Sequence, residues 1–439
     1  MSIRSARDGS QPAELCRLLE LSRARTLGLS RDFTPEQLLG PKLAVVNPPL
    51  WEIGHLGWFQ ERWCLRLRSD GALGPSLLAN ADALYDSAAV AHDSRWELAL
   101  PPLANTLEYL DHVLHAVLEK IGNEADRREL AYFVQLAAFH EQMHCEAFTY
   151  TRQTLAYSRP SIEGTGAVPA GDGSASGDVA LPGGKFWLGA ARNHGFVFDN
   201  EKWRHQVTLA PFAIARNAVT CGQFAAFVED GGYRRRELWC EPGWRWREQE
   251  NAQAPVYWVR RAGGWAYRVF DQVLALQPNI AMMHVNWFEA DAYCRWAGRR
   301  LPSEGEWEQA ASTSPQDPTG AGAKSLYPWG ESAPSAVRAN LFGSARGPVD
   351  VDAYPDGDSA WGCRQMLGNV WEWTADVFAP FPGFVVDPYR EYSQPWFGNH
   401  RVLRGGCYAT DPALIRNTWR NFYTPDRRDV FAGLRTCAL

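Results

Sequence analysis

Two histidines four residues apart are the residues of this chain whose type and spacing most directly indicate chemistry. They lie in the stretch His140-Glu141-Gln142-Met143-His144, within a long segment of helical pattern. Residues at positions i and i+4 share one helix face, with Cβ atoms about 5–6 Å apart, so both imidazoles can reach one metal ion. Taken literally, H-E-x-x-H is a zinc-protease signature with Glu141 as general base. That interpretation needs a further downstream ligand, for which the sequence offers only a carboxylate in a Gly- and Pro-rich loop.

A third histidine shares this environment. Phe133, Ala137 and Phe148 fall on the same helical stripe as the histidine pair, and His55 falls on an aromatic stripe of an earlier segment. Both stripes should face the interior of a bundle, where three imidazoles would converge. Neutral imidazole suits Zn, Fe, Cu or Ni, and three protein ligands leave positions open for substrate or dioxygen. A lone inward histidine is more often a hydrogen-bonded core residue, and Glu141 could instead orient one of the histidines.

The elements that must position these histidines are long amphipathic segments. Helical patterns cover residues of about 11–29, 50–68, 103–122 and 126–157. Four helices of this length with polar connections predict a four-helix bundle, whose sites are built from facing side chains. We assign this bundle to residues 1–158. Residues 159–177 are rich in Gly, Ser, Ala and Pro, which predicts a linker.

Residues 178–439 have a different character. Short β-type runs alternate with turns, and only two helices are clear, one that ends at Trp296 and one that begins with a capping-box pair, Ser303 and Glu306. An insert rich in Arg and Trp covers about 233–280, and no role for it follows from its sequence. We predict an α+β chain of two domains, as its 439 residues also favour.

Composition narrows the classes of function. The net charge of −6 gives no reason to expect nucleic acid, and no apolar run is long enough to span a membrane. Nine scattered cysteines and an N-terminus without an apolar signal segment predict reduced thiols in the cytoplasm. The 20 Trp, 20 Phe and 15 Tyr can be core, and they can also form walls for cationic or ring-shaped ligands. We therefore expect small-molecule substrates, with neither nucleic acid nor a membrane as partner.

The C-terminal domain carries several motifs in a fixed order. They are Leu181-Pro182-Gly183-Gly184-Lys185-Phe186-Trp187-Leu188-Gly189, Asp199-Asn200-Glu201, Arg300-Leu301-Pro302-Ser303-Glu304-Gly305-Glu306-Trp307-Glu308, Gly368-Asn369-Val370-Trp371-Glu372-Trp373 and Leu403-Arg404-Gly405-Gly406. Together they resemble the formylglycine-generating-enzyme (sulfatase-modifying factor) domain, a variant of the C-type lectin fold. Most of these residues have a structural explanation, glycine for tight turns and tryptophan for core. The family's enzymes use a close C-terminal cysteine pair, whereas Cys407 and Cys437 are thirty residues apart, which argues against copper-dependent cysteine oxidation.

The N-terminal domain resembles a DinB-like bundle. The resemblance rests on the motifs Leu50-Trp51-Glu52-Ile53-Gly54-His55 and His140-Glu141-Gln142-Met143-His144. A DinB-like bundle followed by a formylglycine-type domain is the architecture of the ergothioneine sulfoxide synthases, and the resemblance covers almost the whole chain. It implies that His55, His140 and His144 bind non-haem Fe(II). It also implies that O₂ is a co-substrate and that a sulfur donor is joined to the imidazole carbon of hercynine, the trimethylated betaine of histidine.

The C-terminal segment departs from the synthases that use γ-glutamylcysteine. In those enzymes an Asn-Trp-Asp triplet is followed by an Arg four residues after the Asp; the Asn contacts hercynine, and the Asp and Arg hold the donor. Here Asn421 and Arg427 match, but Phe422 and Tyr423 replace Trp and Asp. The resemblance therefore implies that Asn421 and nearby aromatic residues contact hercynine. A donor without an amino group would not need the missing carboxylate.

Two further positions differ from that pattern. The tyrosine that donates a proton in the sulfoxide synthases matches Phe378 to within a residue, and Phe cannot donate a proton. Tyr423 is then the candidate catalytic residue. The residue before the second helical histidine is often Gln, which reaches the substrate, but here it is Met143. Arg95 and Arg427 are candidates for contacting the donor, although either is as readily explained by a salt bridge.

These departures resemble the selenoneine synthase branch, which joins hercynine to a selenosugar. The stretches that look most like it are Asn47-Pro48-Pro49-Leu50-Trp51-Glu52 and Arg420-Asn421-Phe422-Tyr423-Thr424-Pro425. We expect a non-haem Fe(II), O₂-dependent enzyme that forms a C–Se bond between hercynine and a selenosugar. The alternatives are C–S bond formation with γ-glutamylcysteine or cysteine, a DinB-type zinc hydrolase or thiol transferase, and a non-catalytic ligand-binding protein on a lectin-like scaffold.

Overall fold

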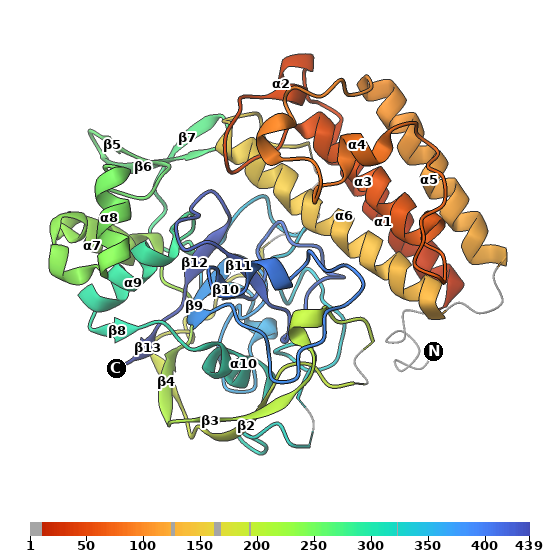
Figure 1. Ribbon diagram of the computed structural model, residues 1–439. Helices are drawn as coiled ribbons and strands as arrows, with labels where there is room; N and C mark the ends of the chain where they lie inside the picture. The colour runs from red at the N-terminus through yellow and green to blue at the C-terminus, as the bar shows by residue number, and fades with distance from the viewer. Residues whose placement is uncertain (1–10, 124–127, 162–167, 193–194, 323) are drawn as a thin grey trace. The chain divides into compact units, whose positions relative to one another are not determined.

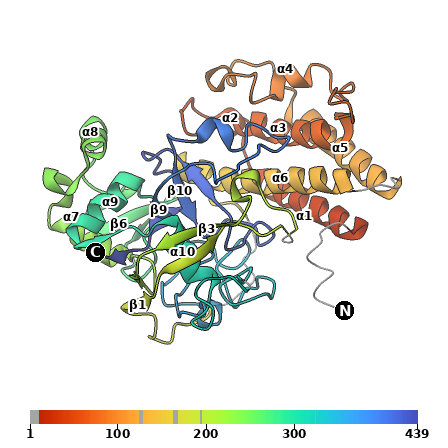
Figure 2. The same ribbon diagram turned by 60° about the horizontal axis from the view of Figure 1, so that its bottom comes forward.

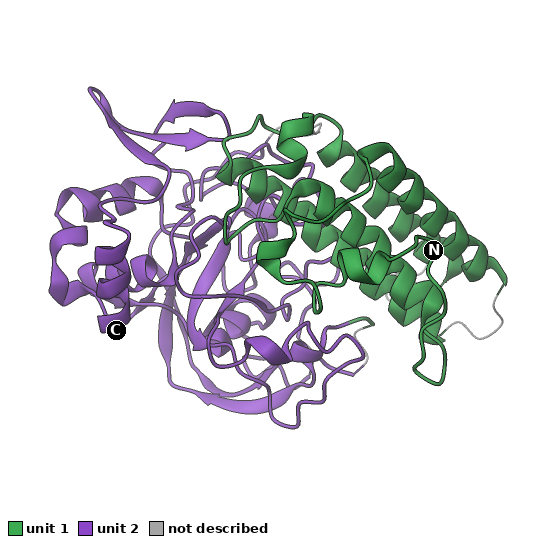
Figure 3. Ribbon diagram, turned by 45° about the horizontal axis from the view of Figure 1, so that its top comes forward, with its two compact units in different colours: residues 1–162, 193–196 green, residues 163–192, 197–439 purple. Residues whose placement is uncertain are grey.

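The computed structural model describes residues 11–123, 128–161, 168–192, 195–322 and 324–439. The chain divides into two compact units, which Figure 3 colours separately. Residues 1–162 with 193–196 form the N-terminal unit, and residues 163–192 with 197–439 form the C-terminal unit. Part of the linker predicted at 159–177 lies outside the described residues. It includes Glu163, the carboxylate that the zinc-protease interpretation would need as a further ligand.

The N-terminal unit is a bundle of helices. Its helical segments are α1 (Pro12–Ser30), α2 (Pro35–Leu39), α3 (Pro49–Glu61), the π-helical turn η2 (Arg62–Arg66), α4 (Ala81–Tyr85), the 3-10 turn η3 (His92–Ser94), α5 (Leu103–Asn123) and α6 (Arg128–Thr154) (Figure 1). The helix α6 packs against both α1 and α3, and α3 packs against α5. The predicted bundle is confirmed, and three of its helices begin with proline, which suits a first helical turn because its missing N–H has no helical partner there.

A buried ion pair ties these helices together. The Nε atom of Arg23 in α1 donates to Oε1 of Glu141 in α6 at 2.9 Å, and the Thr26 hydroxyl donates to the same oxygen at 2.7 Å. The remaining nitrogens of Arg23 donate to the side chain of Gln60 in α3 and to the carbonyl oxygen of Leu110 in α5. One guanidinium therefore joins all four long helices, and its charge is balanced within the bundle.

The C-terminal unit combines small sheets with short helices. Its strands are β1 (Asp178–Leu181), β2 (Gly184–Leu188), β3 (His205–Leu209), β4 (Phe212–Ala215), β5 (Trp258–Arg261), β6 (Gly264–Val269), β7 (Gln272–Ala275), β8 (Arg299–Arg300), β9 (Trp371–Val377), β10 (Arg401–Arg404), β11 (Asn421–Tyr423), β12 (Ala432–Leu434) and β13 (Cys437–Ala438). Their sheet orders are β1-β4-β13-β8, β11-β10-β9-β12, β2-β3 and β5-β6-β7. The predicted α+β class is confirmed.

The helices of this unit are short, and α7, α9 and α10 begin with a capping box. They are α7 (Cys221–Glu229), α8 (Glu241–Gln249), α9 (Trp287–Trp296) and α10 (Glu304–Ser312), with 3-10 turns η4 (Asp199–Glu201), η5 (Gly232–Arg234), η6 (Arg236–Leu238), η7 (Pro355–Gly357) and η8 (Gln394–Trp396). The first three helices lie together at one side of the unit in Figures 1 and 2. The capping box predicted for Ser303 and Glu306 is present at the start of α10.

The central sheet explains the tryptophan-rich motif of the C-terminal unit. Strand β9 pairs antiparallel with β10 and parallel with β12. Trp371 and Trp373 of β9 are fully buried, and Glu372 between them accepts hydrogen bonds from Arg435 and from the indole of Trp307. These motif residues are therefore structural, as expected from the sequence.

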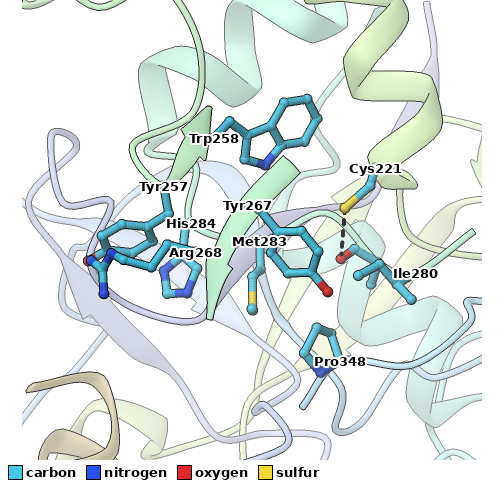
Figure 4. A pocket seen from close by; sticks show the side chains of 10 residues that line it. Cys221, Tyr257, Trp258, Tyr267, Arg268, Ile280, Met283, His284 and Pro348 are labelled. Carbon is cyan, nitrogen blue, oxygen red and sulfur yellow. Dashed lines mark hydrogen bonds between the residues drawn. The ribbon is translucent and has the colours of Figure 1, made fainter. Parts of the chain in front are cut away.

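The insert at 233–280 packs onto the C-terminal unit as α8 and the three strands β5, β6 and β7. It helps to enclose a pocket lined by Cys221, Tyr257, Trp258, Tyr267, Arg268, Ile280, Ala281, Met283, His284 and Pro348 (Figure 4). The cavity volume is about 10 Å³, room for roughly one water molecule. Burial lowers the pKa of His284 to about 3, so its ring is neutral between Tyr257 and Phe431. This pocket is too small for a substrate.

All nine cysteines are free thiols, and most of them are buried. Burial raises the pKa of Cys437 to about 12, so this thiol is protonated at neutral pH. Among the described residues, no helix combines the length and the hydropathy needed to cross a bilayer.

The replacement Glu141→Gln should destabilise the N-terminal unit, because it leaves the Arg23 guanidinium buried beside a neutral amide. Removing one partner of a buried ion pair typically costs about 3–5 kcal/mol, and we expect a loss of about 3 kcal/mol in the free energy of unfolding. Urea denaturation followed by far-ultraviolet circular dichroism measures it. Glu129→Gln, at an exposed position of the same helix, should change the stability by less than about 0.5 kcal/mol. Equal losses in both variants would contradict the cost that we assign to leaving Arg23 without its partner carboxylate.

Candidate metal centre

Three histidines converge inside the N-terminal unit. His55 comes from α3, whereas His140 and His144 come from successive turns of α6. One ring nitrogen of each histidine lies within 4.8 Å of those of the other two. His55 and His140 are buried, and the side chain of His144 is 20% exposed. The structure therefore brings together the three residues that the sequence singled out as metal ligands.

The ring of His55 is held in one orientation. Its Nδ1 atom donates to the carbonyl oxygen of Tyr85 at 2.8 Å, and a carbonyl oxygen can only accept. The proton of the neutral ring is therefore on Nδ1, which leaves the Nε2 lone pair for a metal ion. Trp51 and Trp58 stack on the imidazole, with centroid distances of 4.9 and 5.6 Å.

The ring of His144 is held by a carboxylate. Its Nδ1 atom lies 2.5 Å from Oε1 of Glu52, a residue of α3 that is 1% exposed. This contact likewise keeps the proton on Nδ1 and orients Nε2 as the available nitrogen. The sequence analysis did not assign this role to Glu52. Its spacing of three residues from His55 places both on one side of α3, but the partner on α6 lies 92 residues away.

The third ring, His140, stacks face to face on Phe59 of α3 at a centroid distance of 3.6 Å. Burial lowers the pKa values of His55 and His140 well below the usual range for imidazole. Both rings are therefore neutral at physiological pH. Three imidazoles, two of them with Nε2 freed by hydrogen bonds at Nδ1, fit a divalent transition metal.

Glu141 belongs to another part of the bundle. Both of its carboxylate oxygens accept hydrogen bonds from Arg23, and Thr26 donates to one of them. The expectation that Glu141 orients a histidine is therefore wrong, since Glu52 does so for His144. The same contacts argue against Glu141 as the base of a zinc protease, because a base must be free to take a proton.

Arg95 and Met143 also lie in the N-terminal unit. The Arg95 guanidinium lies 3.9 Å from the centroid of Trp51, the residue that stacks on His55, and donates to Oδ1 of Asn47 at 2.6 Å. Met143 precedes His144 in α6 and is half-buried. The ring of Trp51 thus contacts both Arg95 and His55 of the histidine cluster.

Phe378 and Phe422, candidates from the C-terminal unit, form an aromatic cluster. The two rings stack at a centroid distance of 4.0 Å, 11° from parallel. Phe397 packs on Phe378, while Tyr392 and His400 meet the edge or face of Phe422. This cluster and the histidines belong to different units.

The other candidates of the C-terminal unit lie on β11 and just after it. Oδ1 of Asn421 accepts from the backbone N–H of Phe422 at 2.8 Å. The guanidinium of Arg427 lies 5.0 Å from the ring centroid of Tyr423. It also donates two hydrogen bonds of 2.6 Å to the carboxylate of Asp429. Arg427 thus forms the salt bridge that the sequence had left as an alternative.

Comparisons with known proteins cover both units. Residues 18–148 match the DinB superfamily, and residues 166–438 match the sulfatase-modifying factor enzyme 1-like domain. A hercynine oxygenase of Mycobacterium tuberculosis is 38% identical over 430 residues, 97% of this chain and 99% of that protein. The hercynine oxygenase of Mycolicibacterium thermoresistibile is also 38% identical, over 96% of this chain and 94% of that protein.

A formylglycine-generating enzyme of Thermomonospora curvata is 33% identical over 299 residues, which cover 60% of this chain and 94% of that protein. Its likeness thus involves only part of the chain, whereas the likeness to the hercynine oxygenases runs through both domains. With a DinB-superfamily domain followed by a sulfatase-modifying factor enzyme 1-like domain, the chain belongs to the family of the hercynine oxygenases.

Proposed function

We propose that this protein is a non-haem iron enzyme that uses O₂ to modify hercynine. The observation that carries the proposal is the cluster of His55, His140 and His144 in a chain that is 38% identical to a hercynine oxygenase over 97% of its length. Neutral imidazole ligands suit Fe(II) as well as Zn(II). The oxygenase activity by which the relatives are named favours iron.

The residues around the cluster prepare it for this role. The Tyr85 carbonyl and the Glu52 carboxylate hold protons on Nδ1 of His55 and His144, which leaves the Nε2 atoms available to bind an ion. Iron bound there would supply the reaction with O₂ and hold both substrates side by side. Much of the rate enhancement would then come from proximity and orientation.

The contacts to hercynine are proposed for the C-terminal unit. Hercynine carries a permanent cation, which aromatic faces stabilise, and the half-buried ring of Phe422 offers such a face beside Asn421. Phe378 is fully buried and supports this ring by stacking on it. Phe378 has no proton to donate. We therefore propose the hydroxyl of Tyr423, the last residue of β11, as the proton donor.

We propose a selenosugar as the donor, so that the product contains a C–Se bond to the imidazole carbon of hercynine. Two observations support this donor. Tyr423 stands where the thiol-dependent synthases have a carboxylate for the donor's ammonium group. Arg427 is already paired with Asp429, so a donor carboxylate would have to compete for it. Met143 adds an apolar side chain beside His144, and Arg95 remains a candidate donor contact.

The second candidate function is C–S bond formation with γ-glutamylcysteine or cysteine. The matching positions Asn421 and Arg427 favour it, since both occur in the thiol-dependent synthases. A DinB-type zinc hydrolase or a non-catalytic binding protein receives less support, because Glu141 is occupied by Arg23 and the relatives are oxygenases.

We propose that the enzyme acts in the cytoplasm on small molecules. Its nine free thiols fit a reducing compartment. The net charge of −6 gives no support to nucleic acid as a partner.

The replacement His140→Ala should abolish both iron binding and turnover, because it removes one of three ligands. Protein reconstituted anaerobically with Fe(II) would be assayed by elemental analysis and by oxygen consumption with hercynine plus donor. His112→Ala, which changes an exposed histidine of α5, should keep the wild-type iron content. Zinc rather than iron in the isolated protein, or turnover that survives His140→Ala, would exclude the proposed iron centre.

Glu52→Gln and Glu141→Gln should separate the two buried carboxylates. The first removes the charge that holds His144, and changes of this kind lower metal affinity about 10–100-fold. The second should leave metal affinity within about twofold of wild type, since changes away from the ligands and their partners have little reason to alter it. Competition of Fe(II) between each variant and a chelator measures the affinity. If Glu141 rather than Glu52 oriented a metal-bound histidine, the order would be reversed.

Competition between a selenosugar, γ-glutamylcysteine and cysteine should identify the donor. With hercynine and O₂ present, mass spectrometry should show mainly the selenosugar adduct. Tyr423→Asp restores the carboxylate of the thiol-dependent pattern and should shift consumption toward γ-glutamylcysteine by about tenfold, as expected for one added charge-assisted hydrogen bond. If the wild-type protein consumes only an amino-acid thiol, the selenosugar proposal fails and C–S bond formation replaces it.

A further inference from the structure

We infer that the five-residue helix α4 is part of the metal centre, because its last carbonyl groups and its packing on Gly54 fix the ring of His55. The inference rests on the proposed metal-binding function and assigns positioning residues to it. The last carbonyl groups of any helix lack partners within the helix. In α4, the Leu84 carbonyl accepts from the Trp51 indole at 2.7 Å, and the Tyr85 carbonyl accepts from Nδ1 of His55 at 2.8 Å.

The first turn of α4 also binds α3 and the π-helical turn η2 that follows α3. Asp82 accepts from the Trp58 indole at 2.7 Å and from both terminal nitrogens of Arg66 at 2.8 and 2.7 Å. The hydrogen bonds from Arg66 lower the pKa of Asp82 to about 2, so the carboxylate stays charged. Both ends of α4 are therefore bound to the helical segment that carries His55.

The anchors of α4 are also the rings that flank His55. Trp51 lies one helical turn before His55 and Trp58 one turn after it, and both stack on the imidazole. Because each indole N–H is bound to α4, neither ring can turn without losing its hydrogen bond. The imidazole is thus confined on both faces, and its Nδ1 atom is confined by Tyr85.

Gly54 is what allows α4 to approach this closely. Tyr85 is fully buried, and a Cβ atom added at Gly54 would lie 2.2 Å from Cζ of its ring. Glycine is unfavourable in a helix interior relative to alanine, so this position needs a specific explanation. Contact with Tyr85 supplies it: any side chain at position 54 would push α4, and the carbonyl oxygen of Tyr85, away from His55.

The first test changes one anchor of α4 and leaves the ligands intact. Trp51→Phe removes the indole N–H that binds Leu84 but keeps an aromatic ring. Trp96→Phe is the matched control, because it removes an indole N–H that donates to the carbonyl of Gly40 elsewhere in the unit. Anaerobic titration with Co(II), followed by its visible absorption, should give several-fold weaker binding for Trp51→Phe and wild-type binding for Trp96→Phe.

The second test moves α4 itself. Gly54→Ala should weaken Co(II) binding about 10–100-fold, as loss of a hydrogen-bond partner of a metal-bound histidine does. Gly57→Ala is the control on the same helix, since its Cβ would meet Leu110 rather than α4. The double variant Gly54→Ala with Tyr85→Leu removes the colliding ring and should recover part of the affinity. Nitrogen-15 spectra of histidine-labelled, metal-free protein should show the His55 proton on Nδ1 in the wild type and not in Gly54→Ala.

The possible outcomes separate this inference from the proposed function. A wild-type protein with the His55 proton on Nε2, or equal metal affinities in Gly54→Ala and the wild type, would overturn the role of α4. Equal weakening by Gly57→Ala or by Trp96→Phe would do the same, because general packing would then explain the effect. If Gly54→Ala does not fold, the pair of tryptophan variants decides. If the wild type binds no metal while its spectra show the Nδ1 proton, the proposed function fails and the positioning of His55 stands.

Discussion

Three imidazole rings that lie close together inside a helix bundle cannot all be positively charged, and this restriction shapes the surroundings of the histidines in the N-terminal unit. Burial keeps His55 and His140 neutral. A neutral buried imidazole still has one N–H that needs an acceptor, because an unsatisfied donor is costly to bury. The acceptors found for His55 and His144 are Tyr85 and Glu52. These two hydrogen bonds join α3 to α4 and α3 to α6.

The buried pair of Arg23 and Glu141 is separate from the carboxylate that holds His144. Arg23 donates hydrogen bonds to the Glu141 carboxylate of α6 and to neutral oxygens of α3 and α5. One cation of α1 thus contacts the other three long helices. In the C-terminal unit, Arg404 bridges Glu304 and Glu308 of α10 in a comparable way, again fully buried. Buried ion pairs of this kind add little net stability compared with apolar packing, but they strongly disfavour arrangements that separate the partners.

Much of the helical unit could be predicted from the sequence, and less of the rest. Long apolar stripes indicate α3 and α6 and the direction of their histidines, and the capping pair at Ser303 marks the start of α10. Such signals are local. The contact of Glu52 with His144, the parallel pairing of β9 with β12 and the small pocket under the insert join segments that are far apart in the sequence. The H-E-x-x-H motif suggested that Glu141 acts beside the histidines, but Glu141 pairs with Arg23. Adjacent residues of a helix point in directions about 100° apart, so Glu141 does not share the direction of His140.

That angular difference limits how α6 can change in evolution. His140 faces α3, where it stacks on Phe59, whereas the next residue, Glu141, faces Arg23 of α1. Gaining or losing a single residue within this part of α6 would rotate everything beyond it by about 100° and would separate His144 from its partner Glu52. Point substitutions can be accommodated one at a time, but length changes cannot. Descendants of this protein should therefore vary the composition of this segment while keeping its length unchanged.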